Sequence, residues 1–241
     1  MADTDEAPGA SSREEGQEPE DGGSKKRVVA LGVLVLIAVA IAGVLWLRPF
    51  SDSETEATDI EGEAIAAAVS VEGEALPAFE SVSDPSADPA VGMPAPALEG
   101  TGLDGEPLTI DPDDGTPRAL VFLAHWCDVC QEQLSVLQKA VAEGELRDDV
   151  RLVAISTGVR QGEANYPPGP WFREQGWQVP TLVDSEDRNA AAIYGLRAYP
   201  YWVFTTGQGT VVGRLDELLT VDGLGQLMEE LATREAETSQ R

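Results

Sequence analysis

Twenty consecutive residues without a charge, 28–47, divide the chain into parts that cannot share one folded core. A helix of this length rises about 30 Å, which matches the hydrocarbon core of a bilayer. A cleaved signal peptide has a shorter apolar stretch, closely followed by small residues at the cleavage site. Here Arg48, Pro49 and a series of acidic residues follow instead. The segment therefore predicts an uncleaved transmembrane helix.

The charges on either side of this span set its expected orientation. Three consecutive basic residues precede it at positions 25–27, whereas no basic residue occurs between Arg48 and Arg118. Basic residues prefer the cytoplasmic side of a membrane. We therefore expect a single-pass cell-membrane protein with its N-terminus in the cytoplasm and residues 49–241 outside it.

The composition of the remaining chain predicts its domain boundaries. Residues 1–27 and 48–90 are acidic and poor in large apolar side chains, which is typical of disorder. We expect a disordered cytoplasmic tail and a self-repelling, extended linker. The folded domain is expected at residues 91–236, with a short tail at 237–241. A domain of this length is large enough to bury one core.

The residue counts exclude several classes of function. The chain has 43 acidic and 16 basic residues and a formal net charge of −27, which argues against nucleic-acid binding. It contains two cysteines and one histidine. These numbers exclude a disulfide-rich scaffold, a four-thiolate metal site and a histidine-rich metal centre. We expect neither a metal nor a cofactor.

The pattern of residues 91–236 predicts an α/β fold in which helices cover both faces of a mixed sheet. Short apolar runs indicate buried strands, and apolar residues spaced by three or four indicate helices. The expected strands cover 108–110, 118–124, 150–156, 181–184, 201–205 and 210–214, and the expected helices cover 128–142, 171–175, 188–194 and a last segment from about 220.

The chemistry of the chain is predicted by Cys127 and Cys130, which are expected where a buried strand ends and a helix begins. The unpaired N–H groups and the dipole at a helix N-terminus stabilise a thiolate at the first position. The second thiol is expected one turn further along, shielded, where it resolves mixed disulfides. A C-x-x-C pair in this context predicts a redox-active dithiol.

The alternatives for these two thiols are weaker. Covalent haem attachment needs a histidine at position 131, which is Gln, and zinc needs four ligands. A structural disulfide in so small a loop removes little chain entropy. A redox-silent binding or assembly module with a permanent Cys127–Cys130 bridge remains the alternative.

Residues 91–236 resemble the thioredoxin superfamily, and specifically its membrane-anchored TlpA/ResA-like thiol–disulfide oxidoreductases. The resemblance rests on the segments FLAHWCDVC at 122–130, PTLVD at 180–184 and AAIYGLRAYPYWVF at 191–204. It implies a thioredoxin-like fold, catalytic roles for Cys127 and Cys130, and a cis-proline beside them. Pro180 and Pro200 compete for that position. Pro200 is favoured because a strand, a glycine-rich turn and a second strand follow it.

The resemblance also implies a substrate site and partners. Trp126, Tyr199 and Pro200 are expected to bind substrate, and the backbone at Tyr199 is expected to hold an extended substrate segment. The implied partners are protein thiols or disulfides and a membrane redox donor or acceptor.

The sequence departs from the family pattern where the proton acceptors should be. Val121 stands where thioredoxins carry a buried acid, and Gln133 stands where ResA-like proteins carry Glu. His125, Asp128 and Glu132 are therefore the expected modulators. Protonated His125 would favour the thiolate, whereas Asp128 opposes it, so we expect an intermediate or reducing potential.

Overall fold

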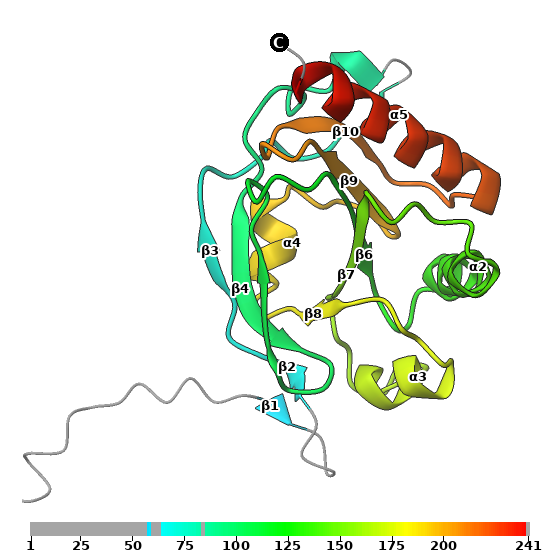
Figure 1. The fold of residues 1–241 in the computed structure, drawn as a ribbon. Helices are drawn as coiled ribbons and strands as arrows, with labels where there is room; N and C mark the ends of the chain where they lie inside the picture. Colours follow the sequence, from blue (N-terminus) through cyan, green and yellow to red (C-terminus); the bar gives the residue numbers. More distant parts are fainter. Residues whose placement is uncertain (1–56, 59–63, 83–84, 240–241) are drawn as a thin grey trace, which may run out of the picture. The chain divides into compact units, whose positions relative to one another are not determined.

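Strand β6 (Arg118–Leu123) lies inside the sheet, and all six of its residues are buried. It pairs in parallel with β7 (Arg151–Ser156) and antiparallel with β9 (Tyr201–Thr205). This arrangement is seen in a computed structural model (Figure 1), which describes residues 57–58, 64–82 and 85–239. The expected membrane span 28–47 lies outside these residues. No helix within them is long and apolar enough to cross a membrane.

The sheet is mixed, as expected, and has the strand order β10-β9-β6-β7-β8-β4-β3, with β5 paired to β4. Strands β6, β7 and β8 are parallel, and the other neighbours in this order are antiparallel. Strand β4 is not among the strands that the sequence predicts, because its Glu-Gly-Thr-Gly segment has the composition of a turn. The bounds not given above are Ser70–Glu72 for β3, Ala97–Gly102 for β4, Pro107–Ile110 for β5, Thr181–Val183 for β8 and Val211–Leu215 for β10.

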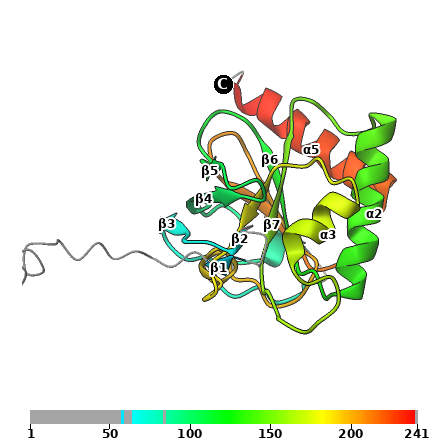
Figure 2. The same cartoon turned by 90° about the horizontal axis from the view of Figure 1, so that it is seen from below.

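Helices cover both faces of the sheet, as expected (Figure 1). Helices α2, α3 and α5 lie together on one side, and Figure 2 shows the same grouping from below. The alternation of β6 explains the two layers: Leu120 and Phe122 face one core, whereas Ala119 and Val121 face the other. The bounds are Asp128–Glu143 for α2, Pro168–Glu174 for α3, Asn189–Ile193 for α4 and Val221–Ser239 for α5.

The folded part begins before residue 91, so the expected linker 48–90 is wrong for residues 64–82 and 85–90. Strand β3 pairs antiparallel with β4, and short strands β1 (Ala57–Thr58) and β2 (Ala64–Ala66) pair with each other. The side chains of Val69, Leu76 and Phe79 are buried in the core on the α4 side of the sheet. The composition of this segment does not predict strands, because its few large apolar residues are separated by Ala, Ser and Glu.

A buried ion pair holds the end of this N-terminal segment. Asp88 follows the 3₁₀ turn Pro85–Ala87, and both of its carboxylate oxygens accept hydrogen bonds from the Arg214 guanidinium of β10, one of them over 2.7 Å. Arg214 also donates to Pro77 O at 2.8 Å and to the Tyr201 hydroxyl at 3.2 Å. The segment is therefore connected to β10 and β9 through charge as well as through apolar packing.

Candidate active site

The two cysteines lie at the start of α2, just beyond the C-terminal end of β6. Cys127 is the N-cap residue, with φ −85° and ψ 115°, and its sulfur accepts a hydrogen bond from Cys130 N over 3.3 Å. Cys127 is half-buried, Cys130 is fully buried, and both are free thiols in this structure. The expected strand–helix junction is confirmed.

The two thiols differ in their environment. Burial raises the pKa of Cys130 far above its usual value, and the adjacent Cys127 adds to this shift. The Cys130 thiol therefore stays protonated near neutral pH while it is shielded. Cys127 is the thiol that a substrate can reach first.

The Tyr199–Pro200 peptide bond is cis, as expected, and leads directly into β9. The carbonyl oxygen of Tyr199 lies 3.9 Å from the sulfur of Cys127. The structure thus brings the expected proline segment to the first thiol. A second cis bond, Tyr166–Pro167, was not expected from the sequence.

Trp126 connects the dithiol to the loop after β7. Its Nε1 donates to Gly158 O at 2.7 Å, its ring meets Tyr199 edge-on at 5.7 Å between centroids, and the Arg160 guanidinium carbon lies 3.6 Å from its ring centroid. Gly158 has φ +64°, and a Cβ there would lie 2.5 Å from the Tyr199 hydroxyl oxygen. Only glycine lets this loop approach Tyr199 so closely.

The neutral ring of His125, which follows β6, binds the backbone of the same loop after β7. It is 1% exposed; its Nδ1 lies 2.7 Å from Ala164 O, and its Nε2 accepts the Arg160 N–H over 3.0 Å. These partners require a proton on Nδ1 and a lone pair on Nε2. Burial lowers the pKa of His125, which favours the same neutral form. In this neutral form His125 adds no positive charge beside the Cys127 thiolate.

Val121 and Gln133, which stand at the positions expected to carry acids, contribute to packing and to backbone hydrogen bonds. Val121 packs in the core, and the buried Gln133 amide bonds the backbone of Leu219, donating to its O at 3.2 Å and accepting from its N over 2.7 Å. Gln133 thus connects α2 to the segment that precedes α5. Asp128 and Glu132 are both exposed, as expected for Glu132.

A model of the AhpC/TSA family matches residues 91–214, just over half of the chain. The chain belongs to the AhpC/TSA family. Together with the adjacent thiols at the start of α2, this membership confirms the expected oxidoreductase of the thioredoxin superfamily. No curated protein sequence matches the chain.

Several solved structures resemble this AhpC/TSA-family chain. A putative protein disulfide isomerase from Bacteroides thetaiotaomicron has 20% identity and a TM-score of 0.52, over 63% of this chain and 95% of its own. The exposed lipoprotein thioredoxin Etrx1 of Streptococcus pneumoniae has 25% identity and a TM-score of 0.47, over 56% and 99%. StoA from Bacillus subtilis has 20% identity and a TM-score of 0.48, over 57% and 98%. The first of these supports the thioredoxin-like fold.

Sequence reasoning missed one buried acid near the site of this AhpC/TSA-family chain. Asp184 follows β8, and its carboxylate accepts hydrogen bonds from Thr157 Oγ1 at 2.7 Å and from Ala190 N at 2.9 Å. Burial raises its pKa. The sequence does indicate this role, because an acid between a short apolar strand and an Ala-rich helix is well placed to accept hydrogen bonds from the first helical N–H groups.

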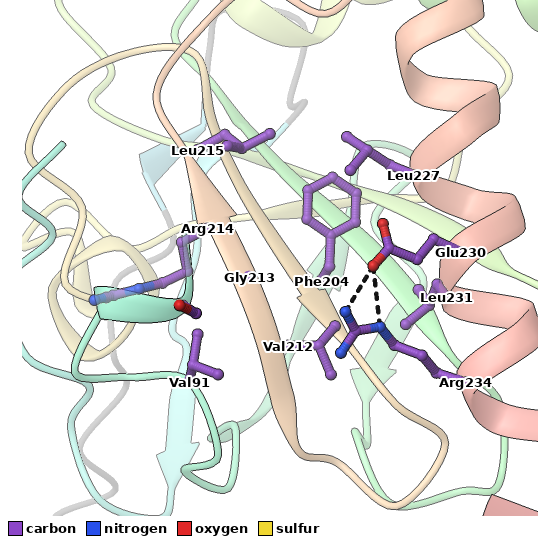
Figure 3. Close-up of a pocket in the computed structure, with 11 residues that line it drawn as sticks. Val91, Phe204, Val212, Gly213, Arg214, Leu215, Leu227, Glu230, Leu231 and Arg234 are labelled. Carbon is purple, nitrogen blue, oxygen red and sulfur yellow. Dashed lines mark hydrogen bonds and ion pairs between the residues drawn. The ribbon is translucent and has the colours of Figure 1, made fainter. Parts of the chain in front are cut away.

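A separate groove lies between β10 and α5 (Figure 3). Apolar side chains line it, and an ion pair between Arg234 and Glu230 lies at its edge. None of its lining residues belongs to the loops around Cys127. Within the described part of the chain, no cluster of three His, Cys, Asp or Glu residues could hold a metal ion.

Proposed function

We propose that this protein is a membrane-anchored, extracytoplasmic thiol–disulfide oxidoreductase that exchanges disulfides with protein thiols through Cys127 and Cys130. One observation carries the proposal: a half-exposed thiol caps α2, 3.9 Å from Tyr199 O, with a buried second thiol one turn behind it. The accessible thiol suits attack on a substrate, and the buried thiol suits resolution.

The reaction follows from these two positions. The Cys127 thiolate attacks one sulfur of a substrate disulfide, the substrate S–S bond breaks, and the second substrate sulfur leaves as a thiolate that takes up a proton. Cys130 then loses its proton and attacks Cys127, which releases the first substrate sulfur as a thiolate. Two electrons have moved from the dithiol to the substrate, and a membrane redox donor must supply two electrons to reduce the new Cys127–Cys130 disulfide.

The substrate backbone is held beside the cis-proline in this proposal. The Tyr199 carbonyl can accept a hydrogen bond from an extended substrate segment, and Trp126 and Pro200 border the same place. His125 is neutral, and Asp128, which is exposed between the cysteines, is an acid. Neither residue therefore places a positive charge beside the Cys127 thiolate. An intermediate to reducing potential of about −200 to −280 mV follows by analogy with known dithiols.

Trapping tests the proposal. Cys130→Ala should accumulate mixed disulfides between Cys127 and client proteins, which reductant releases, and Cys127→Ala should accumulate none. Equilibration with glutathione and dithiothreitol buffers then gives the potential. An absence of trapped clients, together with a free-thiol count that mild reductant leaves unchanged, would instead favour the redox-silent binding or assembly module.

The membrane anchor is tested separately. The uncharged span at 28–47 and its basic N-terminal flank support a cytoplasmic N-terminus and an external oxidoreductase domain. Protease added to intact spheroplasts should digest the domain and spare the N-terminal tail. A soluble mature protein that lacks residues 1–47 would contradict this topology.

A further inference from the structure

Three arginines of the described part of the chain differ from six of its other basic residues. Arg160, Arg188 and Arg197 are exposed, and none of them lies in an ion pair with a carboxylate of the described residues. Six other basic residues do form such pairs: Arg118, Lys139, Arg147, Arg151, Arg214 and Arg234. In a chain with a net charge of −27, arginines without a carboxylate partner at one place require an explanation.

Two of these arginines flank the aromatic pair next to Cys127. The Arg160 guanidinium lies over the Trp126 ring, 3.6 Å from its centroid. Arg188 lies in the segment between β8 and α4, and its charge opposes the rise in the pKa of the Tyr199 hydroxyl caused by burial. Trp126 and Tyr199 contact each other edge-on. A substrate segment that lies against this pair therefore meets the Arg160 guanidinium directly, and the charge of Arg188 acts on the same pair.

The placement of these arginines follows from the topology. Arg160 lies in the loop after β7, Arg188 follows β8, and Arg197 precedes the cis-proline that leads into β9. Strands β7 and β8 are parallel to β6, so their C-terminal ends meet at the edge of the sheet where Cys127 lies. Two segments distant in sequence, the loops after β7 and β8, thus carry Arg160 and Arg188 to the end of the sheet where the dithiol lies.

Carboxylates on the same loops leave these guanidinium groups available. Asp128, Glu163, Glu186 and Asp187 are exposed. The ion pairs of the described residues include none between these acids and the three arginines. A guanidinium binds a carboxylate through two parallel N–H bonds. The contact with the Trp126 ring restrains the Arg160 guanidinium and involves no carboxylate.

We infer that Arg160 and Arg188 select substrates whose disulfide is flanked by carboxylates, that is, an acidic segment of a partner protein. This inference rests on the proposed function and specifies its substrate class. The acidic segment would meet guanidinium groups that have no carboxylate partner among the described residues, on a protein whose net charge of −27 otherwise repels it. Recognition would therefore depend on these two arginines and not on the overall charge. Opposite charges also accelerate the encounter at low ionic strength.

Matched peptides test the inference. The reduced full-length protein in detergent is mixed with two disulfide-bonded peptides that differ only in Glu or Gln beside the cysteines. We expect reduction of the Glu peptide to be about tenfold faster in kcat/KM at low salt, with the preference falling as salt screens the charges. Equal rates for the two peptides would overturn the inference. Failure to reduce either peptide would instead contradict the proposed function.

Variants show whether the arginines cause the preference. Arg160→Gln and Arg188→Gln should each lower the Glu-to-Gln rate ratio, the double variant should bring it close to one, and the Lys variants should retain part of it. Arg234→Gln removes the same charge from the ion pair on α5 and should keep the full ratio. If Arg234→Gln lowers the Glu-to-Gln rate ratio as much as Arg160→Gln does, the preference depends only on the net charge of the protein. That result would overturn the inference.

Glutathione disulfide, which also bears carboxylates, separates a small-molecule substrate from a protein segment. If the arginines accelerate its reduction more than that of the Glu peptide, the assignment of a protein partner is wrong.

Discussion

At the scale of single residues, the difference between the two thiols is set by burial. Burial raises the pKa of Cys130, so this thiol stays protonated well above neutral pH, whereas Cys127 is half-exposed. We expect iodoacetamide at pH 7 to label one thiol of the native reduced protein rapidly and two in denaturant. Cys127→Ser should abolish the rapid labelling, and Cys130→Ser should keep it. Equal labelling rates for both native thiols would contradict this assignment.

The single histidine gives a second prediction at this scale. Burial lowers the pKa of His125 below its usual 6.5, so the unfolded chain binds a proton first as the pH falls. The stability contributed by neutral His125 is therefore present above about pH 6.5 and is lost as the pH falls toward its folded pKa. Urea unfolding at pH 7.5 and 5.5 should show this loss in the wild type but not in His125→Asn.

The same variant tests whether His125 acts through charge. His125→Asn removes hydrogen bonds to the loop and should cost about 1–3 kcal/mol at pH 7.5. Its redox potential should stay close to that of the wild type, because a neutral ring adds no charge to the thiolate. A large shift in potential would show that His125 acts as a cation.

At the scale of the elements, the loop after β7 positions the substrate-binding aromatics. Gly158→Ala places a Cβ 2.5 Å from the Tyr199 hydroxyl oxygen in a backbone with φ +64°, so Tyr199 must move. We expect turnover with a protein disulfide to fall several-fold, in addition to a backbone cost of about 1 kcal/mol. Gly162→Ala is the matched control, because φ is +83° there and no atom lies within 4 Å of the added Cβ. Similar turnover in the two variants would show that contact with Tyr199 is unimportant.

At the scale of the whole molecule, the buried pair of Asp88 and Arg214 joins the N-terminal segment to the sheet. Burial alone raises the pKa of Asp88, but hydrogen bonds from Arg214 and Ala90 N and the charge of Arg214 outweigh it, so the net pKa lies below its usual value. The stability that this pair provides is therefore present above about pH 4 and is lost as the pH falls through the lower folded pKa.

Substitution of one partner tests this connection. Asp88→Asn leaves a buried guanidinium without its counter-charge and should destabilise the full-length protein by about 3–5 kcal/mol in urea unfolding. Asp149→Asn, which removes an exposed partner of Arg147, should cost less than about 1 kcal/mol. If both variants unfold at the same urea concentration, the Asp88–Arg214 pair does not hold the segment.

Local patterns in the sequence were sufficient for the elements that carry the chemistry. The apolar run of β6 and the helical spacing of α2 lie within short segments, so the C-x-x-C junction could be predicted from them. The cis-proline is what the family resemblance implies, and the hairpin pattern after residue 200 favours Pro200 over Pro180. The same reasoning failed for residues 64–82 and 85–90, because strand β3 is defined by pairing with β4 and its neighbours by burial against α4 rather than by composition.

The sequence by itself therefore determined the mixed sheet with helices on both faces and the dithiol at a helix start, and its resemblance to the thioredoxin superfamily added the proline beside the dithiol. Only the tertiary structure decided the states of the polar residues around that site. His125 is neutral because Arg160 and Ala164 reach its ring from 35 and 39 residues away, and Gln133 is structural because it bonds Leu219, 86 residues along the chain. Burial and hydrogen-bond partners set the charge and role of a side chain, and here the partners come from distant segments that local sequence patterns do not reveal.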